Sequence, residues 1–260
     1  MHYTFCAQTD MGRVRKNNED SVAFDETTQL AVLADGMGGY NAGEVASGMA
    51  TTYIKSKLTQ WFCEAGPQIN IGQVRRSLAL CVGSANHAIF NAARDNPHYS
   101  GMGTTLVVGV FLDAKLMLGH IGDSRCYRLR GNELLQITKD HSLLQEKIDA
   151  GLLTPVQAQT APNRNLVTRA LGVQEIVPLE LNEYYVEAGD IYLMCSDGLS
   201  DMVEDTAIGK ILQEGTPLAQ KAVELVALAN TNGGRDNISV LLTQASSNAA
   251  KNGFMSSLPG

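Results

Sequence analysis

The sequence predicts an α+β fold in which antiparallel sheets are covered by pairs of helices. Three observations lead to this prediction. Residues 42–62 and 71–94 carry apolar side chains at helical spacing, residues 104–138 are a run of short β-rich segments, and a second helical pair follows at 203–214 and 217–230. Helices and strands are thus grouped rather than alternating, which is typical of α+β domains.

The N-terminal third contains one apolar strand followed by the first helical pair. Leu30–Ala34 is a short apolar run that ends at an Asp-Gly pair, as a buried strand does. One face of each helix is apolar, and residues 64–70, which contain Gly and Pro, separate the two. The apolar faces consist of Ala46, Ala50, Ile54, Leu58 and Trp61, and of Val74, Leu78, Cys81, Val82, Ala85 and Ile89.

The middle of the chain predicts an antiparallel meander. Thr104–Leu112 and Lys115–Ile121 are β-rich, with Asp113-Ala114 as the turn between them. Arg125–Leu129 and Glu133–Thr138 flank Arg130-Gly131-Asn132, which is a good hairpin signal.

Beyond the meander, 142–160 reads as short helical pieces around Gly151 and Pro155. The polar, irregular stretch from about 140 to 175 predicts a mobile flap over a site.

The C-terminal part predicts two more strands, the second helical pair and a last strand. The strands are Tyr184–Glu187 and Ile191–Cys195, around a turn at Ala188-Gly189-Asp190, and the last strand is Ile238–Thr243. Residues 246–260 are rich in Ser, Asn and Gly and are expected to be disordered. The sequence therefore predicts one domain at 1–245 followed by a tail.

Bulk properties exclude several classes of protein. A net charge of −7 argues against a nucleic-acid partner, because phosphate neutralisation needs clustered Lys and Arg. No apolar run reaches the roughly 18 residues that span a membrane, and the N-terminus does not resemble a secretory signal. The five cysteines form no C-x-x-C pair, which favours free thiols in a reducing cytoplasm.

Acidic motifs at strand ends are the most informative feature of the chain. Asp35-Gly36 and Asp197-Gly198 each follow an apolar strand, Asp123 stands in Gly-Asp-Ser-Arg, and Asp236 stands in Arg-Asp-Asn before the last strand. Oxygen ligands of this kind suit Mg²⁺ or Mn²⁺. We therefore expect a metal-assisted hydrolase in which Asp35 contacts two ions and the Gly36 carbonyl supplies a further oxygen.

Each aspartate also has a structural explanation. Asp35 would form an ordinary Asp-Gly turn, Asp197 would cap a helix, Asp236 would pair with Arg235, and Asp123 would be a turn residue. Four such motifs at strand ends favour the metal site over coincidence. Asp201, four residues after Asp197, could share its site.

Two basic residues near acidic motifs are further candidates. Arg15 precedes Asp20 in Arg-Lys-Asn-Asn-Glu-Asp, and its guanidinium fork suits phosphate, although a solvated surface arginine is the alternative. His141 could donate a proton, but a capping or surface histidine is favoured. No Gly-rich phosphate loop ending in Lys-Ser/Thr is present.

Taken together, the motifs resemble those of the metal-dependent Ser/Thr protein phosphatases of the type 2C (PPM) family, specifically its compact bacterial members. Eight matches run in order from about residue 4 to 243. They are Arg15–Asp20, Asp35–Gly39, Gly103-Thr104-Thr105, Gly122–Arg125, Asp140-His141-Ser142, Thr168–Gly172, Ser196–Leu199 and Arg235–Asn237.

The resemblance implies a four-layer α-β-β-α sandwich with a metal cluster in a cleft. It implies that Asp35, Gly36, Asp197 and Asp236 hold two central Mn²⁺ or Mg²⁺ ions. Asp20 would orient metal-bound waters together with Glu19. Asp123 would hold a weaker third ion with Asp197 and Asp201, and Arg15 would grip the substrate phosphate.

The implied activity is hydrolysis of phosphoserine and phosphothreonine in proteins by a metal-activated water, reversing a cognate Ser/Thr kinase. Where animal members carry a histidine proposed as general acid, this chain has Met37, which cannot donate a proton. Two rival functions stay open at this point. One is a catalytically silent phosphoprotein-binding regulator, against which the intact aspartate set argues, and the other is hydrolysis of a small phosphoester.

Overall fold

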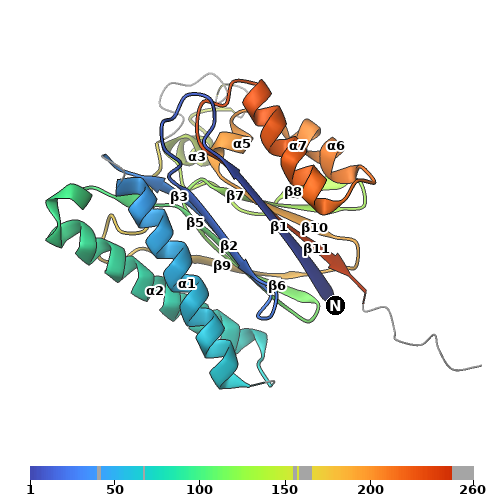
Figure 1. Cartoon of the computed structure of the whole chain (residues 1–260), viewed down its shortest axis with the longest axis horizontal. Helices are drawn as coiled ribbons and strands as arrows, with labels where there is room; N and C mark the ends of the chain where they lie inside the picture. Colours follow the sequence, from blue (N-terminus) through green and yellow to red (C-terminus); the bar gives the residue numbers. More distant parts are fainter. Residues whose placement is uncertain (40–41, 67, 155–156, 158–165, 248–260) are drawn as a thin grey trace, which may run out of the picture.

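The computed structural model describes residues 1–39, 42–66, 68–154, 157 and 166–247. In these residues two antiparallel β-sheets pack face to face between two layers of helices (Figure 1). Helices α1 and α2 cover one sheet, and α6 and α7 cover the other. The predicted α+β class and its four layers are therefore confirmed.

The first sheet has the strand order β1-β11-β10-β7-β8, so the last of the described strands lies inside the sheet next to the first. Its strands are β1 (His2–Asp10), β7 (Arg125–Arg130), β8 (Glu133–Gln136), β10 (Ile191–Cys195) and β11 (Ile238–Ser246).

The second sheet has the order β2-β3-β5-β6-β9, with the short β4 paired to β3. Its strands are β2 (Asp20–Asp25), β3 (Leu30–Met37), β4 (Gly103–Thr104), β5 (Leu106–Leu112), β6 (Lys115–Ile121) and β9 (Glu180–Tyr185). The helices of the described residues are α1 (Ala42–Ala65), α2 (Ile71–Asp95), η1 (Pro97–Tyr99), α3 (Leu143–Asp149), α5 (Asp197–Ser200), α6 (Asp205–Gln213) and α7 (Leu218–Thr231).

Strand β3 shows how the sequence builds two cores at once. Leu30, Val32 and Ala34 belong to the core beneath α1 and α2, whereas Ala31 and Leu33 belong to the core between the sheets. Alternate residues of a strand point to opposite faces, so a continuous apolar run is buried on both sides. Fully burying one side chain of the Leu or Val type contributes about 1.5–3 kcal/mol, and the run therefore fixes β3 firmly between the layers.

Most predicted elements are confirmed, including the two turns of the meander. Asp113 and Gly131 occupy those turns with positive φ values of 54° and 57°. Two strands, β1 and β2, were not predicted, and β9 covers 180–185 instead of 184–187.

Two boundaries also needed correction. Ser246 was assigned to the tail but pairs with His2 as the end of β11. The rest of the predicted tail from 248 onward lies outside the described residues. In 142–160 the structure describes one helix, α3, while residues 155–156 and 158–160 lie outside it.

The segment predicted as a flap is closed at its base and joined to the second sheet. Ser142 forms an isolated β-bridge with Val167, and Leu171 forms another with Thr104 of β4. Of the described helices, none combines the length and the apolar character that a membrane crossing requires.

Candidate metal centre

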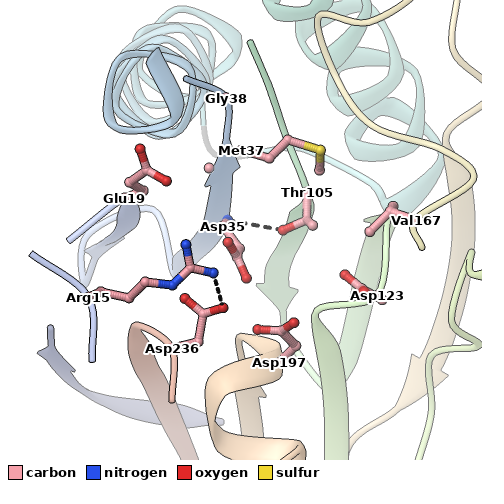
Figure 2. Close-up of a pocket in the computed structure, with 11 residues that line it drawn as sticks. Arg15, Glu19, Asp35, Met37, Gly38, Thr105, Asp123, Val167, Asp197 and Asp236 are labelled. Atoms are coloured by element: carbon pink, nitrogen blue, oxygen red, sulfur yellow. Dashed lines mark hydrogen bonds and ion pairs between the residues drawn. The ribbon is translucent and has the colours of Figure 1, made fainter. Parts of the chain in front are cut away.

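Carboxylates from distant parts of the sequence meet in one cleft of about 250 Å³ (Figure 2). Asp35 comes from β3, Asp123 follows β6, Asp197 begins α5 and Asp236 precedes β11. The predicted residues Asp35, Asp123, Asp197 and Asp236 are therefore brought together. The cleft is lined by Arg15, Glu19, Asp35, Gly36, Met37, Gly38, Thr105, Asp123, Val167, Asp197 and Asp236.

Asp35 is held by its backbone, which leaves its carboxylate directed into the cleft. Its N–H donates to Thr105 Oγ1 at 3.0 Å, and its carbonyl accepts from Thr105 N at 2.9 Å and from Thr104 Oγ1 at 2.8 Å. Burial raises the pKa of this carboxyl well above its usual range, and the nearby charges of Asp20 and Asp197 raise it further. An ionised Asp35 therefore needs a cation beside it.

Asp20 lies directly opposite Asp35 in the pairing of β2 with β3. Its Oδ2 accepts a hydrogen bond from Ser196 Oγ at 2.8 Å, which joins the two sheets next to the cleft. Among the described residues, none donates to the buried Oδ1. The free lone pairs of this atom fit the predicted role of orienting a metal-bound water.

Asp197 and Asp236 enter the cleft from the other sheet. Asp197 begins α5 immediately after β10, and Ser196 occupies the N-cap position. Burial raises the pKa of the Asp197 carboxyl well above its usual range, with Asp123 and Asp236 adding repulsion. Asp236 pairs with Arg15, not with Arg235, the partner that the loop interpretation assumed.

Asn237 fastens the N-terminal loop to this edge of the sheet. Its Nδ2 donates to the carbonyls of Met11 at 3.0 Å and Asn17 at 2.8 Å, and its Oδ1 accepts from Glu19 N at 2.8 Å. The loop that carries Arg15 and Glu19 is thus fixed beside Asp236.

Asp123 occupies the far side of the cleft from Arg15 (Figure 2). Burial, followed by the charge of Asp140, raises its pKa to about 6. Asp201 is not among the residues that line the cleft, but its charge contributes to the raised pKa of both Asp123 and Asp197. Its N–H donates to the Asp197 carbonyl at 2.8 Å, so it lies one helical turn from that ligand candidate.

Gly36 is a position that only glycine can occupy. A Cβ there would lie 2.1 Å from the Gly43 carbonyl oxygen and 2.6 Å from that of Glu19. Its N–H also donates to Glu19 O at 3.1 Å. Three backbone segments approach closely at this point, and this packing fixes the peptide after Asp35 in the wall of the cleft.

Arg15 lies at the opening of the carboxylate cluster. Its Nη2 donates to Asp236 Oδ2 at 2.5 Å, while half of the side chain remains exposed to solvent. The hydrogen bond with Asp236 raises the pKa of the guanidinium, which is therefore always charged. A guanidinium that is held by a carboxylate on one side and exposed on the other can bind a phosphate that arrives from solvent.

These residues fit divalent cations of the hard type. Several buried carboxylates repel one another and hold raised pKa values, while the buried Oδ1 of Asp20 lacks a donor among the described residues. Mg²⁺ and Mn²⁺ prefer this all-oxygen donor set and would offset its surplus charge. Asp35, Gly36, Asp197 and Asp236 could hold the central ions, and Asp123 could hold another.

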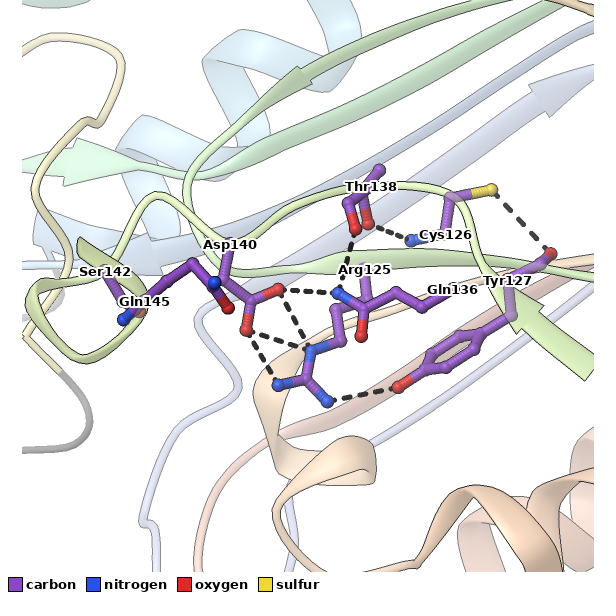
Figure 3. Close-up of polar contacts among 8 residues, drawn as sticks. All are labelled: Arg125, Cys126, Tyr127, Gln136, Thr138, Asp140, Ser142 and Gln145. Carbon is purple, nitrogen blue, oxygen red and sulfur yellow. Dashed lines mark hydrogen bonds and ion pairs between the residues drawn. The ribbon is translucent and has the colours of Figure 1, made fainter. Parts of the chain in front are cut away.

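A second polar cluster joins two of the sequence motifs, Gly122–Arg125 and Asp140-His141-Ser142 (Figure 3). Arg125, from Gly-Asp-Ser-Arg, donates Nη2 to Asp140 Oδ2 at 2.7 Å, and Asp140 also accepts from Gln136 Nε2 at 2.9 Å. Arg125 Nη1 donates to Tyr127 Oη at 3.1 Å. The cluster fixes the loop after Asp123 against the start of the predicted flap.

The structure places both Met37, which stands where animal members carry a proposed acid, and His141, the candidate proton donor. Met37 lines the cleft and has no proton to give. His141 does not line it and is only 7% exposed, so it is neither a surface histidine nor in contact with the cleft. The cap of α3 is Ser142.

Sequence reasoning gave no role to the hydroxyl and amide groups behind the carboxylates. Thr105, Ser196 and Asn237 each adjoin or oppose an acidic candidate, yet they were noted only as parts of motifs. One signal could have identified them. A small polar residue beside an aspartate at a strand end can supply the hydrogen-bond partner that a backbone N–H or a carboxylate needs there.

Comparison with known proteins gives a consistent family. The family model described as Protein phosphatase 2C matches residues 9–242. The chain is 39% identical over 238 residues to protein phosphatase PhpP of Streptococcus pneumoniae, covering 90% of this chain and 94% of PhpP. It is 43% identical over 239 residues to serine/threonine protein phosphatase PstP of Mycobacterium tuberculosis, covering 92% of this chain but only 44% of PstP.

A solved structure agrees with the sequence comparisons. The catalytic domain of PstP in complex with two manganese ions superposes with a TM-score of 0.81 at 38% identity, covering 94% of this chain and 99% of that one.

Proposed function

Because the chain belongs to the protein phosphatase 2C family, it is a metal-dependent protein serine/threonine phosphatase, and we propose that the carboxylate cleft is its catalytic site. The observation that carries this proposal is the convergence of Asp35, Asp123, Asp197 and Asp236 on one cleft. Such a set of buried, mutually repelling carboxylates is costly unless cations bind among them.

The proposed ligands of the two central ions are Asp35, Gly36, Asp197 and Asp236. When bound, divalent ions lower the pKa of a water and offset charge on phosphoryl oxygens. Asp35 is proposed to contact both ions, since it is clamped on its backbone side by Thr105 and faces carboxylates on the other. The Oδ1 of Asp20, which accepts from none of the described residues, supports a role in holding water together with Glu19, which lines the cleft.

Arg15 is proposed to bind the phosphate of the substrate. Its ion pair with Asp236 places the guanidinium at the edge of the cluster, and its exposed half faces solvent. The same contact gives it a fixed direction, so that little side-chain entropy is lost when a phosphate is bound.

Asp123 is proposed to hold a weaker third ion, with Asp201 contributing charge nearby. The two manganese ions of the PstP structure support the central pair only. Because Met37 cannot protonate a leaving group, we propose that water ordered at this part of the cleft supplies the proton to the alcohol.

The phosphoprotein substrate and the setting are also proposals. A cognate Ser/Thr kinase, a signalling role, a bacterial source and a cytoplasmic location are supported by the bacterial relatives and by five free cysteines. We further propose that the catalytic domain runs from residue 1 to the end of β11 at Ser246. The segment from about 140 to 175 is proposed as a flap, supported by the presence of Val167 in the cleft wall; its residues 155–156 and 158–165 lie outside the described part of the chain.

The decisive experiment measures phosphate release from a phosphothreonine peptide and from a small aryl phosphate, each with Mn²⁺, with Mg²⁺ and with excess chelator. We expect turnover of the peptide with either ion and none with chelator. Full activity in chelator would refute the cation-dependent site. Binding of the peptide without turnover in Mn²⁺ would support a silent regulator, and exclusive turnover of the aryl phosphate would support a small-molecule phosphatase.

A further inference from the structure

Outside the cleft, the structure gathers two buried histidines, His120 and His141, and the partly exposed Glu180 into a cluster whose possible ligand atoms all lie within 4.8 Å of one another. His120 on β6 and Glu180 on β9 are directly paired across the strands. The rings of His120 and His141 stack with their centroids 4.7 Å apart. The two histidines are 2% and 7% exposed, so the cluster is closed to solvent on its imidazole side.

The protonation of His141 decides what the cluster does. The N–H of Gly122 donates to His141 Nδ1 at 3.1 Å, so this nitrogen carries a lone pair. In the neutral ring the proton must then reside on Nε2, which lies 3.3 Å from Glu180 Oε2 and donates to it. A metal ion at Nε2 would have to displace that proton and leave an imidazolate, which argues against a cation site here.

The same contacts make His141 a two-point clamp on the backbone of one residue, Gly122. Its backbone N–H donates to the Gly122 carbonyl at 2.8 Å while its Nδ1 accepts from the Gly122 N–H. Gly122 has a φ of +105°, and a Cβ there would lie 2.7 Å from the Thr105 side chain. The next residue is Asp123, whose carboxylate faces the cleft.

Glu180 holds the clamp in its working orientation. Its Oε1 accepts from Asn182 Nδ2 at 2.8 Å, which leaves Oε2 for His141. The His141 carbonyl accepts from Thr168 N at 2.8 Å, so the base of the predicted flap is attached to the same residue.

We propose that His141, oriented by Glu180, is a positioning residue that fixes the Gly122 backbone and thereby directs Asp123 at the weaker cation. The inference rests on the proposed role of Asp123. Groups that orient metal ligands in this way typically account for about 10–100-fold in metal affinity.

The test compares His141→Leu with His141→Asn in the full chain. The two side chains have nearly the same shape, but Asn places an acceptor oxygen where Nδ1 lies and Leu does not. Three quantities are measured: Mn²⁺ binding by calorimetry, amide hydrogen exchange at Gly122 in the metal-free protein, and phosphopeptide turnover against Mn²⁺ concentration. His87→Leu, which removes an exposed histidine on α2, is the control.

In His141→Leu we expect the dissociation constant of the weakest Mn²⁺ to rise roughly 10-fold, with the tighter ions within about two-fold of their original affinity. Exchange at Gly122 should accelerate, and turnover should recover at high Mn²⁺. His141→Asn should restore most of each quantity, which a purely packing role of the ring would not explain. Equal behaviour of the Leu and Asn variants, or unchanged weak-site affinity in folded His141→Leu, would overturn the inference.

Two further variants keep the outcome unambiguous. If His141→Leu does not fold, Glu180→Ala at the partly exposed end of the clamp should weaken binding of the same Mn²⁺ by about three-fold, and unchanged affinity would overturn the inference.

If Asp123→Ala keeps every ion, the proposed role of Asp123 fails and the positioning role fails with it. If Asp123→Ala loses the weak ion while His141→Leu keeps it, only the positioning role is overturned. A cation lost from both His141 variants but retained by Asp123→Ala would show that the histidine cluster binds metal itself.

Discussion

Asp20 and Asp35 stand directly opposite each other across β2 and β3, so two carboxylates share one cross-strand position at the edge of the cleft. Like charges placed in this way destabilise a sheet. The chain tolerates the arrangement because Ser196 donates to Asp20 and because the backbone of Asp35 is clamped by Thr105. The pair therefore links folding stability to whatever neutralises the cleft.

Asp35→Asn should lower turnover by at least about 10²-fold, the range observed when a major electrostatic element of a site is removed. The substitution keeps the shape of the side chain but halves its capacity to contact cations. Phosphopeptide turnover at saturating Mn²⁺ measures the effect, and cooperative thermal unfolding verifies the fold. Near-normal turnover in folded protein would refute the role of Asp35 between two ions.

The metal-free protein should lose stability as pH rises, and Asp35→Asn isolates the contribution of one carboxyl. The folded-state pKa of Asp35 lies above the value of about 3.9 for an unfolded Asp, so the native state binds the extra proton. Its stabilising contribution is present below the unfolded pKa and is lost as pH rises through the folded pKa.

In chelator, wild type should therefore unfold at a lower temperature than Asp35→Asn at about pH 7.5, and the gap should shrink toward about pH 5. Mn²⁺ should reverse the order at the higher pH. Melting curves of both proteins under these conditions provide the measurement, and a gap that is independent of pH would contradict the assignment.

Arg15→Ala should raise KM more than it lowers kcat, because the guanidinium is proposed to bind phosphate in both the ground state and the transition state. A loss of roughly 10–100-fold in kcat/KM is expected for a charged bidentate contact. Arg15→Lys keeps the positive charge but cannot form the bidentate contact, so its kcat/KM should lie between those of wild type and Arg15→Ala. Unchanged steady-state kinetics in the Ala variant would restore the interpretation of a surface arginine.

Asp123→Ala should leave two ions bound while turnover falls, because the third ion is held by fewer protein carboxylates. Calorimetric titration with Mn²⁺ counts the ions, and phosphopeptide kinetics on the same preparation give the rate. Loss of all binding would place Asp123 in the central site. Unaltered binding and rate would make it a turn residue.

Gly36→Ala should destabilise the protein by about 1–3 kcal/mol or more, because its methyl group would meet backbone oxygens rather than movable side chains. Gly48→Ala is the matched control, since Gly48 lies in α1 with open space around its Cβ position. That control should stabilise the helix by about 0.5–1 kcal/mol. Urea unfolding of both variants measures the difference, and equal stability would contradict the crowding at Gly36.

Periodicity and turn residues were sufficient to predict most of the fold. The apolar run at Leu30–Ala34 and the amphipathic helices carry their burial pattern in the sequence. β2 was missed because every one of its residues is only partly buried, so neither an apolar run nor a clean alternation marks it. β1 mixes polar and apolar residues and owes its structure to pairing with β11 at the other end of the chain.

The charged residues of the candidate site could be predicted from the sequence, but the residues that hold them in place by hydrogen bonds could not. Asp35, Asp123 and Asp197 stand at strand ends beside glycine or after apolar runs, where local pattern is informative. The contacts of Ser196 with Asp20 and of His141 with Gly122 depend on how separate segments meet. No local pattern encodes such a meeting, and only the assembled sheets reveal it.

The position of β11 has a consequence for synthesis of the protein. Of the described strands this one is made last, yet it lies between β1 and β10, and His2 pairs with Ser246. A chain still emerging from the ribosome can form the helical hairpin of α1 and α2, but it has an open gap where β11 belongs and has not yet placed Asp236. Pairing at so great a sequence separation is slow to form. We therefore expect a fragment that stops before Asp236 to be inactive, and the site to be complete only once β11 has closed the sheet.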